Sequence, residues 1–314
     1  FFVTPHTHDV HSHRHDHSAC GSTGGGGGAR PARTIDGPIP KVVPLHMGHG
    51  SKSLTVGAPA TPGLHGLVGV TEDQNTKHKN YMEDGFVVVP KLSDKYAYFA
   101  VYDGHSGREA TEYAQTALHN NLLALLNQGV GVEEAYTKSY QVTDDELLAK
   151  GIKSAGATSV SALIVAEGGG RRTLHVANAG DGRAVLCQGG RAVRLSFDHK
   201  VEDEGETKRI LAAGGTILWG RVQGQTMVSR SLGDHDLKKY VIPDPYYSKT
   251  PLDPSCEFII VACDGIWDVA EDQQAVDCVK KAGVGDPQAA SKALIEYVKE
   301  LGTKDNLTAM VVKL

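Results

Sequence analysis

Two Asp-Gly pairs, each directly after a run of apolar residues, constrain this sequence more than any other feature. Asp103-Gly104 follows the apolar run 96–102, and Asp264-Gly265 follows the run 258–263. Runs of this length, rich in β-branched and aromatic residues, are typical of buried strands. An Asp-Gly pair makes a sharp turn and leaves a carboxylate at the edge of the core. The pattern fits either two ordinary hairpin turns or two carboxylates that converge on a metal ion.

The composition is that of a globular protein. The chain has 314 residues, of which 40% are hydrophobic and 22% charged, and its net charge is -5. This length suffices for one large domain or two smaller ones. The slight acidity gives no reason to expect nucleic acid as a partner. No apolar run approaches the length of a membrane span, so we expect no such span.

The cysteines indicate the redox environment. The five of them show no Cys-x-x-Cys spacing, and Cys187 and Cys263 stand in apolar runs. An odd number of buried thiols favours a reducing compartment. We therefore expect a cytoplasmic monomer, with the nucleus as an alternative location.

The N-terminal residues differ in composition from the rest. A histidine tract (5–17) and a glycine run (24–28) precede a stretch rich in Pro, Gly and Ser. Such segments bury too little apolar surface to offset their ordering entropy. The sequence thus predicts a disordered tail over 1–60 and a folded domain over 61–314. The histidines could bind transition metals, but a solvated tail without that role is the favoured interpretation.

A lipid anchor within this tail is a separate hypothesis. A start at Met47 would make Gly48 the first residue of a sequence that resembles an N-myristoylation signal. Lys52, however, stands where that signal has Ser or Thr.

Strands and helices each cluster along the folded part, which favours an α+β fold with antiparallel sheets over alternating α/β. A capping box, Ser106-Gly-Arg-Glu109, predicts a helix to about residue 126. Asp286 is the predicted N-cap of the last helix. Hydrophobic periodicity predicts further helices over 132–150, 204–213, 271–282 and 287–301, and strands over 64–70, 85–90, 96–102, 158–166, 173–179, 183–188, 257–263 and 307–313.

Acidic residues recur at the boundaries between strands and loops: Glu83-Asp84, Asp103, Asp264 and Asp305. A buried carboxylate is costly unless it is paired or bound to a metal. Several together repel one another and raise each other's pKa values. Divalent cations remove this conflict, and ligands made only of oxygen suit Mg²⁺ or Mn²⁺ rather than Zn²⁺ or Cu²⁺. The four positions together favour a metal site over four separate turns.

The sequence resembles the metal-dependent serine/threonine protein phosphatase 2C family. Eight motifs in order, spread over residues 64–314, make the resemblance specific. They are Met82-Glu-Asp84, Val101-Tyr-Asp-Gly-His105, Gly156-Ala-Thr-Ser159, Ala177-Asn-Ala-Gly-Asp181, Leu195-Ser-Phe-Asp-His-Lys200, Val228-Ser-Arg-Ser-Leu-Gly-Asp234, Ala262-Cys-Asp-Gly-Ile-Trp-Asp268 and Lys304-Asp-Asn306.

The resemblance implies a four-layer α-β-β-α sandwich, with a core site for two Mn²⁺ or Mg²⁺ ions at one end of the sheets. It implies that Asp103 bridges the two ions. Asp264 and Asp305 would complete the shell of one ion, and Glu83 and the Gly104 carbonyl that of the other.

The same resemblance implies a role for three further residues. Asp181 would help to hold a third, weaker ion, and Asp84 would orient a coordinated water. The implied activity is that of a hydrolase that removes phosphate from phosphoserine and phosphothreonine in proteins. A water held between two ions would attack phosphorus without a covalent intermediate. His105 would protonate the leaving oxygen; the alternative for His105 is a purely structural hydrogen bond.

One position departs from the family pattern. Lys79 stands where the family usually has an arginine that binds the substrate phosphate. A lysine gives a point charge in place of a two-pronged guanidinium, so we expect weaker phosphate binding. Lys77 and Arg108 are alternatives that the sequence does not rank against Lys79, and a solvated surface lysine is another.

Two hypotheses concern partners. The segment 214–245 corresponds to the family's flap, in which Trp219 and Arg221 either contact substrate or pack the flap on the domain. An inactive adaptor that binds phosphoproteins is the alternative function. Because the acidic residues expected of a metal site remain, we favour an active enzyme.

Overall fold

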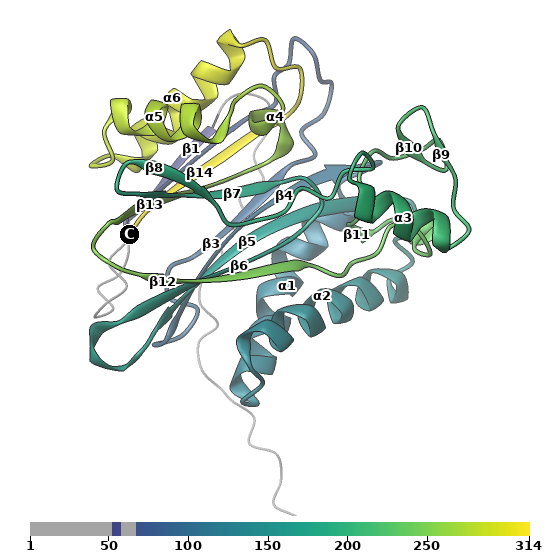
Figure 1. Ribbon diagram of the computed structural model, residues 1–314, viewed down its shortest axis with the longest axis horizontal. Coiled ribbons are helices and arrows are strands. Elements are labelled where there is room, and N and C mark those ends of the chain that lie inside the picture. The colour runs from purple at the N-terminus through teal and green to yellow at the C-terminus, as the bar shows by residue number, and fades with distance from the viewer. Residues whose placement is uncertain (1–51, 58–66) are drawn as a thin grey trace, which may run out of the picture. The chain divides into compact units, whose positions relative to one another are not determined.

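Two six-stranded antiparallel sheets form the framework of the fold. The computed structural model describes residues 52–57 and 67–314, which lie within one unit of the chain, residues 40–314 (Figure 1). The first sheet has the strand order β1 (Lys52–Gly57), β2 (Leu67–Asp73), β14 (Leu307–Lys313), β13 (Cys256–Ala262), β7 (Arg183–Gln188) and β8 (Arg191–Arg194).

The second sheet contains the strand that ends in the first Asp-Gly pair. Its order is β12 (Tyr246–Leu252), β6 (Arg172–Ala179), β5 (Gly156–Ala166), β4 (Tyr96–His105) and β3 (Gly85–Val89). The short strand β11 (Leu232–Gly233) also pairs with β5. A separate hairpin joins β9 (Ile217–Leu218) to β10 (Arg221–Val222).

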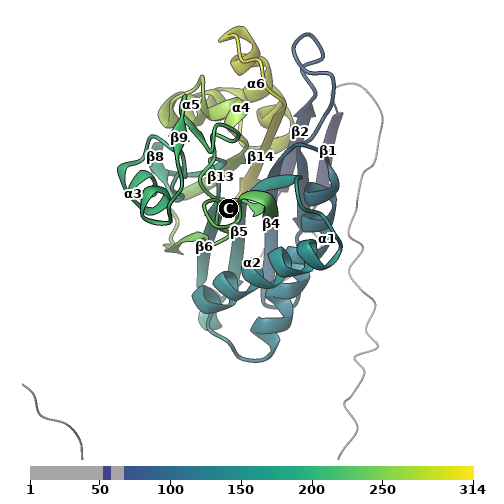
Figure 2. The same cartoon turned by 90° about the vertical axis from the view of Figure 1, so that its right-hand side faces the viewer.

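Helices cover the outer face of each sheet (Figures 1 and 2). α1 (Glu109–Asn127) packs on β4, and α6 (Pro287–Glu300) packs on β2 and β14. The other helices are α2 (Val132–Ala149), α3 (Glu204–Ala212), α4 (Asp264–Trp267) and α5 (Asp272–Ala282), with 3₁₀ turns at Gly168–Gly170 and His235–Leu237. The expected α+β class with antiparallel sheets is confirmed.

The position of β4 between two hydrophobic cores explains why its sequence is apolar throughout, without polar residues in alternation. Phe99 and Val101 lie in the core between the two sheets, whereas Tyr98 and Tyr102 lie in the core beneath α1 and α2. Since successive side chains point to opposite faces of a strand, burial of both faces requires an unbroken apolar run. The end of this strand is therefore fixed firmly between two layers.

The predicted helix start at Ser106 is wrong. α1 begins at Glu109, and its N-cap, Arg108, makes no side-chain capping bond. Ser106 and Gly107 instead adopt φ values of 60° and 123°. This left-handed turn lets the Gly107 N–H donate to Glu83 Oε1 at 2.9 Å. The cap of the last helix is confirmed, because Asp286 accepts from the N–H groups of Gln288 and Ala289.

The tail predicted over 1–60 differs from the structure at residues 52–57, which pair with β2 as strand β1. The sequence Ser53-Leu-Thr-Val56 alternates polar and apolar residues, as an edge strand does. The histidine tract and Gly48 lie outside the described residues. Within residues 52–57 and 67–314, the helices are too short or too polar to cross a bilayer.

The contact between β2 and α6 depends on Gly69. A Cβ at this position would lie closer than 3.0 Å to the backbone of Pro287 and Gln288. Only a glycine allows the helix to start this close to the sheet.

We expect Gly69→Ala to lower the free energy of unfolding by about 1–3 kcal/mol, because overpacking forces a backbone shift. Thermal unfolding followed by circular dichroism measures the effect. Gly285→Ala is the matched control, since a Cβ there meets open space. Equal melting temperatures for the two variants would contradict this account of the contact.

Candidate metal centre

The strand ends bring the predicted acidic residues to one end of the two sheets. Asp103 lies near the end of β4, and Asp264 is the first residue of α4, one residue after the end of β13. Asp305 precedes β14, which pairs with β13, while Asp84 precedes β3, which pairs with β4. The antiparallel pairing places Asp264 and Asp305 at one end of the first sheet, and Asp103 and Asp84 at one end of the second. Asp264 and Asp84 both act on the carboxyl group of Asp103, so these two sheet ends lie beside each other.

Electrostatics confirms that these carboxyl groups are close. Burial raises the pKa of Asp103 well above its usual range, and the neighbouring Asp264 and Asp84 raise it further. The contact of Asp103 with Asp264 also raises the pKa of Asp103, and burial raises the pKa of Asp264. Burial raises the pKa of Asp181 too, and Asp264 adds to this. The cluster therefore holds more negative charge than it can keep ionised.

Several carboxylate oxygens in this cluster have no partner. Asp84 Oδ1, Asp181 Oδ1 and Asp264 Oδ1 are buried without a hydrogen bond. Such atoms are costly in a native structure and call for an explanation. A hard divalent cation fits them, because it takes oxygen ligands and cancels the mutual repulsion.

The acidic side chains contact protein groups at some of the positions where a cation would bind. Within the described part of the chain, no three His, Cys, Asp or Glu side chains are arranged as a ready group of metal ligands. The Lys79 ammonium forms an ion pair with Asp305. This ion pair neutralises part of the charge that a cation would otherwise neutralise.

Glu83 and Gly104 are held against each other. A Cβ on Gly104 would lie closer than 3.0 Å to Thr111 Oγ1 and to the Glu83 carbonyl. The Glu83 N–H donates to Asn306 Oδ1 at 3.0 Å, and the carboxylate accepts from Gly107. The first Asp-Gly pair is therefore not the sharp turn expected from the sequence, because both residues lie within β4 and the chain turns only at Ser106 and Gly107. The close approach to Glu83 and Thr111 is what requires a glycine at position 104.

Asn306 is a site residue whose role the sequence reasoning missed. Its Oδ1 accepts from the Glu83 N–H, and its Nδ2 donates to the carbonyls of Gln74 and Tyr81, each at 2.9 Å. Arg108 holds the same segment from the other side, because its Nη1 donates to the carbonyls of Met82 and Asp84. Asn306 follows Asp305 in the last motif, and this position was the one sequence feature that could have identified it as a site residue.

The three candidates for phosphate binding, Lys79, Lys77 and Arg108, differ in their contacts and exposure. The Lys79 side chain is 38% exposed and lies beside Asp305, close enough to Asp103 and Asp264 for their charges to act on it. Burial by itself lowers the pKa of Lys79, but Asp305 and these two charges outweigh it and raise the pKa. Arg108 is committed to backbone carbonyls, and Lys77 is exposed. The geometry favours Lys79.

His105 follows the first Asp-Gly pair at the end of β4. Its Nε2 lies 2.9 and 2.7 Å from the two carboxylate oxygens of Asp234. Asp234 closes the motif Val228-Ser-Arg-Ser-Leu-Gly-Asp234, but the sequence reasoning gave it no role.

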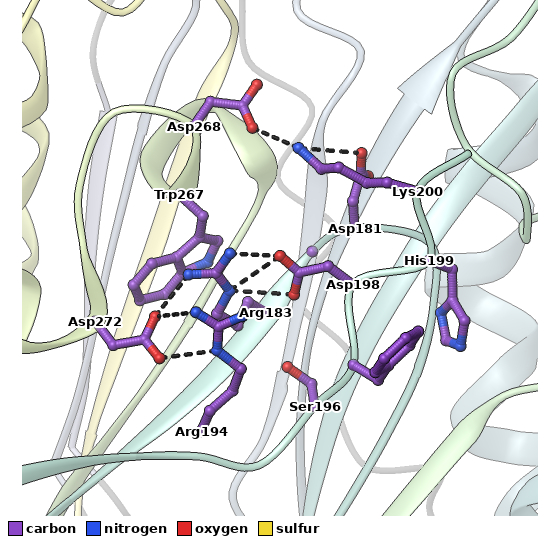
Figure 3. A network of polar contacts seen from close by, with 12 residues as sticks. Asp181, Arg183, Arg194, Ser196, Asp198, His199, Lys200, Trp267, Asp268 and Asp272 are labelled. Atoms are coloured by element: carbon purple, nitrogen blue, oxygen red, sulfur yellow. Dashed lines mark hydrogen bonds and ion pairs between the residues drawn. The ribbon is translucent and has the colours of Figure 1, made fainter. Parts of the chain in front are cut away.

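Asp181 lies between β6 and β7, next to Lys200. Lys200 Nζ donates to Asp268 at 2.6 Å and lies 3.9 Å from Asp181 Oδ2 (Figure 3). The same view shows Arg183 between Asp198 and Asp272, with its guanidinium 5.1 Å from the Trp267 ring. This network braces α4, the helix that begins at Asp264.

A buried carboxylate holds the flap, residues 214–245, against α3. Glu206 accepts from Arg230 Nη2 and from Ser229 Oγ, each at 2.7 Å. Burial alone would raise the pKa of Glu206, but these bonds and one from Arg209 lower it to about 2.

The two flap residues singled out in the sequence lie apart from this anchor. Trp219 is 91% exposed, so it does not pack the flap on the domain. Arg221 donates to the Gln225 carbonyl within its own hairpin.

Comparisons with known proteins agree with one another. A sequence model of the family described as "Protein phosphatase 2C" matches residues 68–307. "Protein phosphatase 2C homolog 1" of Saccharomyces cerevisiae is 35% identical over 263 residues, covering 78% of this chain and 92% of that protein. The protein of the same name in Schizosaccharomyces pombe is 37% identical over 257 residues, covering 79% of this chain and 73% of that protein.

A solved structure has the same fold. The crystal structure of serine-threonine phosphatase 2C from Toxoplasma gondii superposes with a TM-score of 0.68 and is 24% identical in sequence. The match covers 84% of this chain and 99% of that structure.

The cluster predicts an unusual dependence of stability on pH. Burial raises the pKa of Asp84 from 3.8 to about 7. Between these values the folded chain keeps a proton that the unfolded chain has lost, so stability falls as pH rises through this window. Without divalent cations, we expect Asp84→Asn to gain melting temperature relative to the unmodified protein between pH 5 and 8.

Added Mn²⁺ should reduce that difference at pH 8, because it stabilises the ionised cluster. Asp94→Asn is the control, since Asp94 is exposed and forms an ion pair with Lys91 at the surface. A difference between the Asp84 variant and the unmodified protein that does not change with pH would show that Asp84 has an ordinary pKa.

Proposed function

Because this chain belongs to the protein phosphatase 2C family, whose members are metal-dependent protein serine/threonine phosphatases, we propose that the acidic cluster at the end of the two sheets is its active site. The protein removes phosphate from phosphoserine and phosphothreonine in protein substrates. The observation that supports the site is the crowding of buried carboxylates, three of which leave an oxygen without a partner.

The proposed ligands divide between two core positions. Asp103 would serve both. Asp264 and Asp305 would serve one, and Glu83 and the Gly104 carbonyl would serve the other. When bound, Mn²⁺ or Mg²⁺ lowers the pKa of a coordinated water and offsets the charge of the phosphoryl oxygens. All these ligands are oxygens, which is the donor type that both ions prefer.

Two further carboxylates complete the proposed site. Asp181, with one unpaired oxygen, helps to hold a third and weaker ion. Asp84 accepts from Thr308 Oγ1 at 2.7 Å through Oδ2, which leaves Oδ1 to orient a water.

Lys79 has a double role in this proposal. Its ammonium pairs with Asp305. With a cation held at Asp305, the ammonium would be available to the substrate phosphate. As a point charge it fixes the phosphate less precisely than an arginine would.

The chemistry proceeds by direct attack of water, without a covalent intermediate. Cys263 lies beside Asp84, but burial raises the pKa of its thiol well above the usual range. It therefore stays protonated and is a poor nucleophile. His105, next to the proposed ligand Gly104, gives its proton to the leaving oxygen.

The adaptor alternative is not favoured, since Glu83, Asp103, Asp264 and Asp305 are all present. We place the enzyme in the cytoplasm or nucleus, because the described cysteines Cys187, Cys256, Cys263 and Cys278 are free thiols.

The test of this function is the hydrolysis of a phosphothreonine peptide with Mn²⁺, with Mg²⁺ and with a chelator. We expect turnover only with a cation. Asp103→Asn should lower kcat about 1,000-fold, because the shared ligand supports several kcal/mol of charge stabilisation. Asp94→Asn is the control and should keep full turnover. Release of phosphate that does not depend on a cation would refute the proposal.

We expect Lys79→Arg to lower KM for the phosphopeptide about 3- to 10-fold with little change in kcat, since a bidentate contact adds ground-state binding. Steady-state kinetics measures both constants. Lys77→Arg makes the same chemical change at an exposed neighbour and should leave KM unaltered. If the Lys79 variant keeps the original KM, Lys79 does not contact the phosphate.

A further inference from the structure

We propose that Asp234 is a positioning residue that fixes the ring of His105, so that Nδ1 is the nitrogen facing the leaving oxygen of the substrate. This inference rests on the proposed role of His105 as proton donor.

The contacts leave the histidine one free nitrogen. Nε2 lies 2.9 Å from Asp234 Oδ1 and 2.7 Å from Oδ2. The carboxylate also accepts from Ser231 Oγ and its side chain is only 5% exposed, whereas that of His105 is 29% exposed. No described residue hydrogen-bonds Nδ1. Because the buried Asp234 carboxylate accepts from Nε2, Nδ1 is the nitrogen left to face the substrate.

The space for this pair exists because residue 156 is a glycine. Gly156 of β5 pairs with His105 of β4 and with Gly233 of β11, so it lies between the two partners. A Cβ on Gly156 would lie closer than 3.0 Å both to Asp234 Oδ2 and to His105 Nε2. Any larger residue at this position would push the carboxylate and the imidazole apart.

The backbone of Asp234 is strained and held in place. Its φ and ψ of 50° and 38° are left-handed, and its N–H donates to the Ala155 carbonyl at 3.1 Å. The preceding Gly233 N–H donates to Asp144 Oδ1 of α2 at 2.8 Å, and Lys238 Nζ donates to the same atom at 2.9 Å. Strained conformations persist where the surroundings fix them, and they cluster at functional sites.

The arrangement serves one chemical step. The oxygen of water forms a bond to phosphorus while the bond from phosphorus to the seryl or threonyl oxygen breaks. The electron pair stays on that oxygen, which takes the proton of Nδ1. One water proton remains on the phosphate, and the other replaces the proton that His105 gave. Asp234 holds the ring in line through this transfer.

The test compares two substrates with the cation-loaded enzyme. A phosphothreonine peptide needs its leaving oxygen protonated, whereas p-nitrophenyl phosphate releases a stable phenolate. We expect Asp234→Asn and Gly156→Ala to lower kcat on the peptide about 10- to 100-fold, as loss of an orienting partner does. On p-nitrophenyl phosphate the loss should be small. Asp236→Asn is the control, because Asp236 is exposed and contacts Ser154.

Double variants separate positioning from general damage. In a His105→Ala background, Asp234→Asn should cause no further loss. Equal losses on both substrates, or a full additional loss in that background, would overturn the inference. If His105→Ala itself fails to discriminate between the substrates, the proton-donor role is wrong and the inference falls with it. If only the Asp234 variant fails to discriminate, the positioning role alone is wrong.

A measurement on the unmodified chain avoids dependence on the folding of variants. Nitrogen-15 NMR of the imidazoles, with His105→Ala for assignment, reports which ring nitrogen carries the proton in the neutral form. The proton donor is the ring with a proton on each nitrogen, and the neutral form is what remains after Nδ1 has given its proton away. In that neutral form we expect the proton of His105 on Nε2, hydrogen-bonded to Asp234. A proton on Nδ1 would overturn the inference.

Discussion

The mutual repulsion of carboxylates crowded at the end of the two sheets is the constraint on which the rest of this structure depends. Asp84, Asp103 and Asp181 are all pushed toward their protonated forms by burial and by one another. A fold selected only for stability would not gather these groups, because each ionised form is costly in this setting. The surrounding structure supplies what they need: Lys79 near Asp305, glycines where backbones meet, and the braces around α4.

The sequence predicts most of this framework because the central strands are buried on both faces. The unbroken apolar runs that end at Asp103 and Asp264 become β4 and β13. Strand β12 lacked such a signal, since Tyr246–Leu252 is half exposed and contains Pro251. The supposed cap at Ser106 failed because a contact with Glu83, distant in the sequence, imposes the local turn.

The supporting residues of the site were harder to predict than its acidic residues. The carboxylates share a visible pattern, an acid directly beside a strand. Asn306 and Asp234 carry no such pattern, because their roles depend on partners 223 and 129 residues away in the chain. Gly156 in turn has meaning only once the histidine and aspartate on either side of it are in place. Pairing register, which a single sequence does not show, determines all three.

The side chain of Asn306 joins the entry of β14 in one sheet to the segment that leads into β3 in the other. The proposed ligands therefore come from strands that meet only when both sheets have formed and docked in register. Contacts between such distant parts of a chain form late in folding, since their loop-closure entropy must first be offset. A nascent or partly unfolded chain would thus lack the assembled set of ligands, so activity appears only with the complete fold.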